Sequence, residues 1–250
     1  MHTIRVAILA GSTLPLLVFM AGCNSGEQPS QNGAPAPGLK HISRNRLSDS
    51  MTGPIRYLAL GDSTGAGVGA RDGGYVARLF KRIVTHRPGS ALTNLCVSGA
   101  MTSDVLRSQL DRGVRGDPQL ITLGIGINDI GHGVPLEQFS KNFEEILSRL
   151  RSDTKAAIVV TNVPDISSAP RIPQALRTEY HQQIVTFNQK LEEIAARHEV
   201  TVFDNYTVTH EKLPSHPEFF SEDGFHPSDE GYEFWAEQMW PIIALTIGAD

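Results

Sequence analysis

Ser63 has the surroundings of a nucleophile. It follows an apolar run at residues 55–60 that stops abruptly at Gly61 and Asp62. An apolar run that ends in a glycine-rich turn is typical of a buried strand that delivers a side chain to the end of a sheet. Glycine, aspartate and serine are also among the commonest turn formers. Alone, this stretch therefore predicts a nucleophile and a simple tight turn about equally.

A serine hydroxyl is a poor nucleophile at neutral pH and needs a base, a group that orients the base, and hydrogen-bond donors for the oxyanion. His226 is the candidate base, in a loop before a helix start at which Ser228 is a plausible cap. Asp223 lies three residues earlier in the same loop. A carboxylate at that spacing can reach a ring nitrogen and fix the tautomer of the histidine.

Donors for an oxyanion are available from three positions. Asn128 carries a side-chain NH2 group, and Gly99 offers a backbone N–H that no side chain shields. The backbone N–H of Ser63 itself is the third candidate. Together these groups predict a three-donor oxyanion hole.

The elements that must position these residues alternate along the chain. Strands are predicted at residues 55–60, 92–97, 120–125, 157–162 and 200–203, and stretches of helical period separate them. This alternation predicts an α/β fold, with a parallel sheet of about five strands and helices on both faces. Open parallel sheets carry their sites beyond the carboxyl ends of the strands, where the candidates above fall. One domain is expected, from about residue 54 to 246.

The four sequence blocks together resemble the SGNH, or GDSL-type, hydrolase family. They are Gly61-Asp62-Ser63, Asn94-x-x-x-Ser98-Gly99, Gly126-x-Asn128-Asp129 and Asp223-x-x-His226-Pro227, in the order of the family. The resemblance implies a three-layer, flavodoxin-like fold and metal-free ester hydrolysis without a cofactor. It also implies Ser63 as nucleophile, His226 as base, Asp223 as its orienter, and Gly99 and Asn128 in the oxyanion hole. Cys96 stands where many members have glycine, and Thr64 where an aliphatic residue is frequent.

Two other serine-hydrolase plans fit parts of the sequence. Residues 61–65 also match G-x-S-x-G, but in that plan the serine follows several strands and the acid lies far upstream of the histidine. In a chymotrypsin-like protease the histidine and aspartate precede the serine, on an all-β scaffold. Here Ser63 follows the first strand, and Asp223 and His226 come last. The order of the residues therefore excludes both plans.

Other polar residues near these blocks have weaker claims. The loop with Pro164 and Asp165 follows the fourth strand and resembles the substrate-side loop of the family. Asp62 and Asp129 are expected to bond loop backbone so that their neighbours point correctly. Trp235 and a second tryptophan at position 240 are expected to pack in the core.

The histidines outside the blocks predict no further chemistry. His132, which could line the pocket, is expected on balance to be a solvated loop residue, and His210 and His216 are expected at the surface. The histidines are scattered and none has H-E-x-x-H spacing, so no metal site is expected.

The N-terminus predicts export. Residues 1–22 have the plan of a signal peptide, and the ending Met20-Ala21-Gly22-Cys23 resembles a bacterial lipobox, in which the cysteine is lipidated. Residues 23–53 are rich in small and polar residues and predict a flexible tether. An ordinary signal peptide and an uncleaved membrane anchor are the alternatives. The interpretation is a lipoprotein form of the family, held in the cell envelope through its N-terminal lipid.

The net charge of −5, without a densely basic stretch, argues against a nucleic-acid partner. The expected partner is a small-molecule, lipid or glycan ester, and the protein is expected to be a monomer. The predicted activity is a serine esterase that forms an acyl-enzyme on acyl or acetyl esters. Alternatives are an acyl thioesterase or lysophospholipase, a cell-envelope carbohydrate O-deacetylase, and a non-catalytic envelope-binding lipoprotein.

Overall fold

The computed structural model describes residues 39–40, 47 and 52–249. All of these belong to one compact unit, Pro35–Asp250. The predicted signal peptide, Cys23 and most of the predicted tether lie outside the described residues.

A six-stranded sheet with the order β1-β6-β5-β4-β2-β3 forms the centre of this unit. Its five parallel strands are β2 (Arg56–Gly61), β3 (Ala91–Asn94), β4 (Leu120–Gly124), β5 (Ala157–Thr161) and β6 (Thr201–Phe203). All residues of β4 and β5 are buried, as expected for parallel strands covered on both faces. This confirms the predicted α/β fold with a five-stranded parallel sheet.

The sixth strand was not predicted. β1 (Leu39–Lys40) pairs antiparallel with β6 at the open edge of the sheet, within the segment predicted as a tether. Strand pairing uses backbone groups, so a free sheet edge can recruit a segment whose side chains give no strand signal.

β3 is shorter than the predicted strand 92–97. It ends at Asn94, whose side-chain oxygen accepts a hydrogen bond from the backbone N–H of Cys96 at 3.0 Å. This local bond competes with strand pairing and turns the chain toward Gly99. Cys96 is a free, half-buried thiol that packs against the apolar core.

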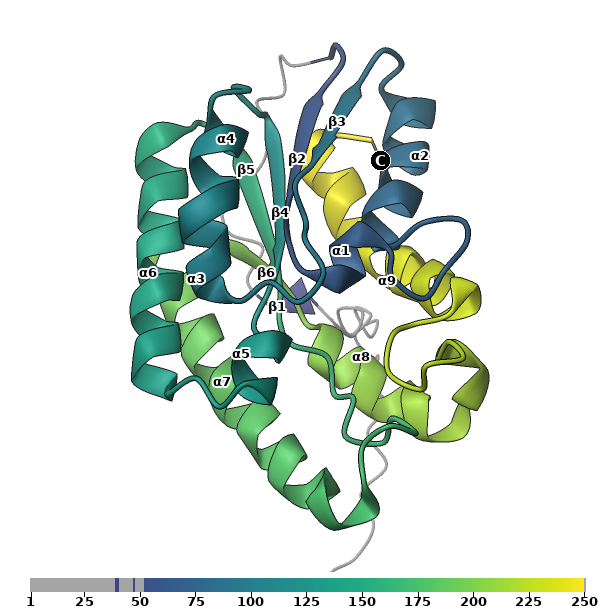
Figure 1. The fold of residues 1–250 in the computed structure, drawn as a ribbon. Helices are drawn as coiled ribbons and strands as arrows, with labels where there is room; N and C mark the ends of the chain where they lie inside the picture. The colour runs from purple at the N-terminus through teal and green to yellow at the C-terminus, as the bar shows by residue number, and fades with distance from the viewer. Residues whose placement is uncertain (1–38, 41–46, 48–51, 250) are drawn as a thin grey trace, which may run out of the picture. The chain divides into compact units, whose positions relative to one another are not determined.

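Helices cover the two faces of the sheet (Figure 1). α2 (Tyr75–His86) and α9 (Asp229–Ile247) pack together on one face, and α6 (Leu136–Asp153) and α7 (Arg177–Arg197) on the other. The strands serve both layers because successive side chains point to opposite faces. The remaining helices are α1 (Ser63–Ala66), α3 (Thr102–Asp104), a π-helical turn (Val105–Gln109), α4 (Leu110–Val114), α5 (Ile127–Gly131), α8 (Asn205–Lys212) and three 3-10 turns (Gln174–Leu176, Leu213–Ser215 and Pro217–Phe219).

The two tryptophans belong to α9. Trp235 is buried and stacks on Tyr75 with ring centroids 4.7 Å apart, which confirms the predicted core packing. Trp240 is half-buried beside His86. None of the helices in the described part of the chain has the length and apolar character that crossing a bilayer would require.

Three short helices begin at the carboxyl edge of the sheet, where β2 leads into α1, β4 into α5 and β6 into α8 (Figure 1). Because the strands are parallel, the residues that follow them meet at this edge. The predicted site residues must therefore be sought here.

Candidate active site

Gly61, at the end of β2, sets the position of Ser63. Its backbone has a φ of 146°, and a Cβ on it would lie 2.2 Å from the carbonyl oxygen of Gly124 on the neighbouring strand. Only glycine fits such a close approach of two backbones. The buried side chain of Gln109 holds the same residue, accepting from the Gly61 N–H and donating to its carbonyl oxygen, each at 2.9 Å.

Asp62 caps α1, the short helix that begins with Ser63. Its Oδ1 accepts hydrogen bonds from the backbone N–H of Thr64 at 2.9 Å and from the Thr64 hydroxyl at 2.8 Å. The predicted role in bonding loop backbone is confirmed. Burial raises the pKa of Asp62 to about 6, although the bonds from Thr64 favour the charged form.

Ser63, His226 and Asp223 form a continuous hydrogen-bonded chain. The Ser63 Oγ lies 3.0 Å from His226 Nε2, and His226 Nδ1 lies 2.5 Å from Asp223 Oδ2. A proton on Nδ1 shared with the carboxylate leaves Nε2 free to accept the serine proton. The structure therefore brings together three predicted residues from the two ends of the domain.

Asp223 is itself fixed by the loop around it. Its Oδ1 accepts from the backbone N–H groups of Phe225 and His226 and from the Ser221 hydroxyl, at 2.8 to 2.9 Å. Partial burial acts to raise the pKa of Asp223, but these bonds and the His226 ring outweigh it and hold the pKa well below its usual range. Asp223 is thus ionised at neutral pH beside the imidazole.

The predicted oxyanion donors flank Ser63. Gly99 follows β3 and Asn128 follows β4, and these strands are the two neighbours of β2. Gly99 has a φ of 78°, with open space where a Cβ would stand. The Asn128 amide donates one N–H to the carbonyl oxygen of Ala100 at 2.9 Å, and the amide has a second N–H to offer.

A buried network ties the two donor loops together. Asp129 accepts hydrogen bonds from the backbone N–H and the hydroxyl of Thr102, and the Asn142 amide donates to the same hydroxyl at 3.0 Å. Asp129 thereby performs the loop-bonding role predicted for it. The network links the turn after Gly99 to the helix that carries Asn128.

An apolar cavity opens beside Ser63 and His226. Residues that follow β4, β5 and β6 line it together with the start of α9 and the loop before it. Its walls are mainly Ile125, Ile127, Val163, Pro164, Ile166, Leu213, Phe219, Phe220, Phe225, Phe234 and Trp235. The catalytic candidates therefore border a pocket suited to an apolar group.

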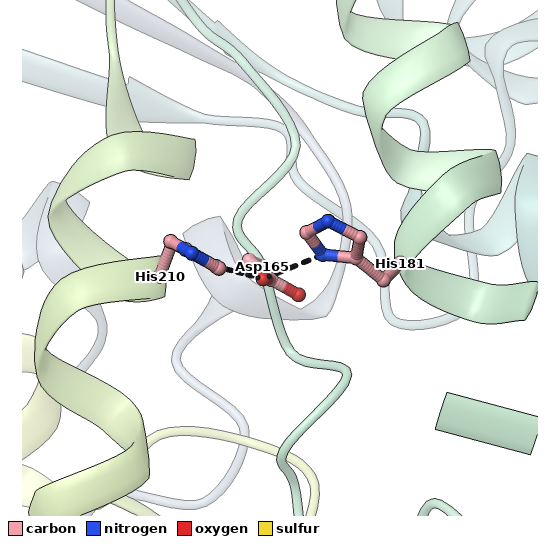
Figure 2. Close-up of side chains that lie close together, drawn as sticks. All are labelled: Asp165, His181 and His210. Atoms are coloured by element: carbon pink, nitrogen blue, oxygen red, sulfur yellow. Dashed lines mark hydrogen bonds and ion pairs between the residues drawn. The ribbon is translucent and has the colours of Figure 1, made fainter. Parts of the chain in front are cut away.

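The predicted substrate loop is divided by the structure. Pro164 lines the cavity, whereas the buried Asp165 points to the outer helices. Figure 2 shows His181 of α7 and His210 of α8 on opposite sides of Asp165, each with Nδ1 bonded to its Oδ2, at 3.0 and 2.7 Å. The Ser167 N–H bonds the other oxygen at 3.0 Å. Asp165 thus joins α7 and α8 to the loop.

Asp165, His181 and His210 are also the group of three in the described residues whose ligand atoms lie close enough to hold a metal ion. Both imidazole rings form a hydrogen bond with the same carboxylate oxygen. These hydrogen bonds explain why the three side chains lie together. His210 and His132 are exposed, as predicted, and His216 is half-buried and bonded to Glu218.

Several functional positions had no signal in the sequence. Gln109 lies 48 residues from the glycine that it clamps, and Thr102 lies 27 residues from Asp129. Both residues are common polar types in helical stretches, so only the folded arrangement reveals their roles. Three aromatic side chains of the cavity wall, Phe219, Phe220 and Phe225, likewise come from the stretch before α9, where the sequence suggested only surface structure.

Fold and site together define the class: a serine hydrolase on an open parallel sheet. The family profile of GDSL-like lipase/acylhydrolases matches residues 59–234. The chain belongs to the GDSL-like lipase/acylhydrolase family, which confirms the resemblance inferred from the sequence, and it is a carboxylic ester hydrolase.

Known relatives agree with this assignment. An arylesterase of Vibrio mimicus is 23% identical over 192 residues, which cover 76% of this chain and 89% of that protein. Two solved structures share the fold. An acetylxylan esterase from Geobacillus stearothermophilus aligns with a TM-score of 0.63 at 18% identity, and the alignment covers 77% of this chain and 95% of the esterase chain. A lipase/acylhydrolase from Enterococcus faecalis aligns with a TM-score of 0.60 at 24% identity, and the alignment covers 76% of this chain and 95% of that chain.

Proposed function

We propose that the protein hydrolyses carboxylic esters through an acyl-enzyme on Ser63. The observation that carries this proposal is the 3.0 Å contact between Ser63 Oγ and His226 Nε2, with Asp223 bonded to the other ring nitrogen. A serine so placed gives its proton to the imidazole as its oxygen attacks the ester carbonyl. The resulting imidazolium is stabilised by the anionic Asp223.

The reaction then proceeds in two halves. The tetrahedral intermediate places its oxyanion between the N–H groups of Ser63, Gly99 and Asn128, and each such donor contributes about 2.7 to 4 kcal/mol to stabilisation of the transition state. His226 returns its proton to the departing alcohol, which leaves an acyl group on Ser63. Water, deprotonated by His226, then attacks this acyl group, and the acid is released as the bond to Ser63 Oγ breaks and His226 returns the proton to that oxygen.

The cavity supports esters with an apolar substituent. The walls beside Ser63 are aliphatic and aromatic, and the related arylesterase is named for esters with an aromatic part. Alkyl or aryl esters of small to medium size are therefore the proposed substrates. A sugar O-acetyl group would leave most of this apolar surface uncovered.

Hydrolysis of p-nitrophenyl acetate, butyrate and octanoate by the wild type, Ser63→Ala and Ser152→Ala tests the proposal. Ser152 is an exposed serine at the end of α6 and serves as the matched control. We expect a loss of at least about a thousandfold in kcat for Ser63→Ala alone. A fluorophosphonate should add to Ser63 in the wild type. Equal rates in all three proteins would refute the nucleophile and favour a binding protein on this scaffold.

We also propose that a lipid on Cys23 holds the enzyme at the bacterial cell envelope. The support is the sequence Met20-Ala21-Gly22-Cys23 after an apolar segment. Cys23→Ser should then move the full-length protein from the membrane fraction to the soluble fraction. An unchanged distribution would instead indicate an uncleaved N-terminal anchor.

A further inference from the structure

Two buried polar side chains that line the apolar cavity have no hydrogen-bond partner among the residues that the structure describes. Asn205 is completely buried, and neither its amide nitrogen nor its oxygen is bonded. The indole N–H of Trp235, which is 5% exposed, is unbonded as well. Buried polar groups nearly always have hydrogen-bond partners. A buried polar group without one lowers the stability of the folded protein.

Neighbouring asparagines show that this is not a general feature of the region. Asn162 donates to Asp204 and Glu192 and accepts from the Tyr206 N–H. The Asn188 amide bonds both the N–H and the carbonyl oxygen of Val163. Every polar atom of these two side chains has a protein partner, whereas the amide of Asn205, a buried residue of the cavity wall, has none among the described residues.

Asn205 and Ser63 line the same cavity but follow strands that are not neighbours in the sheet. Ser63 follows β2 and Asn205 follows β6, and β4 and β5 lie between these two strands. Gly124 and Thr161, which end β4 and β5, line the cavity on the way. Three strand spacings of about 4.8 Å separate β2 from β6, so about 14 Å of sheet edge lies between the strands that lead to Ser63 and Asn205.

We propose that this cavity selects esters whose apolar substituent ends in an oxygen-bearing polar group, a hydroxyl or a ketone. The apolar walls take the carbon chain or ring, the Trp235 N–H donates to the terminal oxygen, and the Asn205 amide donates to it or accepts from it. Asn205 is thus assigned as a residue that determines specificity. This inference rests on the proposed role of Ser63, because the substituent must start at the attacked carbonyl.

The chemistry of the side chains supports this choice of ligand. An asparagine amide offers two N–H donors and one acceptor oxygen, and an indole offers one donor. A hydroxyl uses both kinds of group, and a ketone uses the donors. A purely hydrocarbon substituent would instead leave all of them desolvated and unpaired, which disfavours its binding.

The test compares p-nitrophenyl alkanoates of increasing length with the same esters carrying a terminal hydroxyl. A second series varies the alcohol part of an acetate ester in the same way, because either part can occupy the cavity. The wild type should prefer the hydroxylated ester at one chain length, by about tenfold in kcat/KM. Asn205→Leu, which keeps the branched shape of the side chain and removes its polar atoms, should abolish that preference.

Leu213→Ala is the matched control. Leu213 lines the same cavity and carries no polar group, so its truncation should alter both esters of a pair alike. A folded Asn205→Leu protein whose preference equals that of the wild type at every length, in both series, would overturn the inference. So would a wild type with no preference in either series.

Binding to Ser63→Ala separates this inference from the proposed function. Calorimetry with octanol and with its terminal diol measures recognition without turnover, and the diol should bind about tenfold more tightly unless Asn205 is replaced by leucine. Diol selectivity without esterase activity would refute the catalytic proposal alone. Esterase activity with equal binding of the two alcohols would show that water satisfies Asn205, which would refute the specificity role alone.

Discussion

The raised pKa of Asp62 makes the stability of this protein depend on pH in an unusual direction. Ionisation of most aspartates stabilises the folded protein. Asp62 differs, because burial raises its pKa from 3.8 to about 6. The folded protein then holds this proton more tightly than the unfolded chain does. The contribution of Asp62 to stability is fully present below about pH 4 and is lost as the pH rises through 6.

The size of this effect follows from the two pKa values. A shift from 3.8 to about 6 corresponds to about 3 kcal/mol in the free energy of unfolding. About 1.4 kcal/mol of it falls between pH 5 and pH 7.5, a range that avoids acid denaturation. Asp62→Asn removes the ionisation and keeps an oxygen that can accept from Thr64.

Urea unfolding of the wild type and Asp62→Asn at both pH values measures the effect. The variant should gain about 1.4 kcal/mol relative to the wild type between pH 5 and pH 7.5, since the wild type alone buries a charge. The electrostatic interaction with His226 lowers the pKa of Asp62. The same pair is therefore also compared in a His226→Gln background. A stability difference that stays constant with pH in both backgrounds would refute the reasoning.

Two further predictions concern the support of Ser63 and the chemistry. Gln109→Leu should lower the free energy of unfolding by about 1 to 3 kcal/mol, because the Gly61 N–H loses its acceptor. The Gly61 carbonyl oxygen still accepts from the Val97 N–H. A change below about 0.5 kcal/mol in urea unfolding would contradict this prediction. The second prediction is that kcat/KM falls about tenfold for each pH unit of further acidification once the imidazole base is protonated, because the base must be neutral to accept the serine proton. A steeper fall that returns to tenfold in Asp62→Asn would instead show that activity also requires the ionised Asp62.

The catalytic candidates could be located from the sequence because the chemistry restricts residue types. Ser63, Asp223 and His226 lie in short motifs whose order along the chain is compatible with one fold plan only. The parallel sheet could be predicted for a similar reason, since its strands are short apolar runs such as Ala157–Thr161. In both cases the signal is local in the sequence.

Features that depend on distant neighbours could not be predicted. The glutamine that clamps Gly61 and the strand Leu39–Lys40 both use backbone hydrogen bonds, which any sequence offers. Asp165 lies in the predicted substrate loop, and the bonds from His181 and His210 to its carboxylate, 16 and 45 residues away, had no signal in the sequence. The polar end of the cavity depends on which side chains remain unpaired after folding, and no motif records that.

The position of Ser63 within the sheet separates the chemistry from the recognition of substrate. The proposed oxyanion donors come from the loops after β3 and β4, which flank β2, and these loops are held by short turns and buried hydrogen bonds. Residues that follow β2, β4, β5 and β6 line the cavity, whereas no residue of the loop after β3 does. Changes in the loops after β5 and β6 can therefore alter the ester that is accepted without moving the groups that act on its carbonyl. Asn205, at the far end of that cavity, is placed where such a change would affect specificity alone.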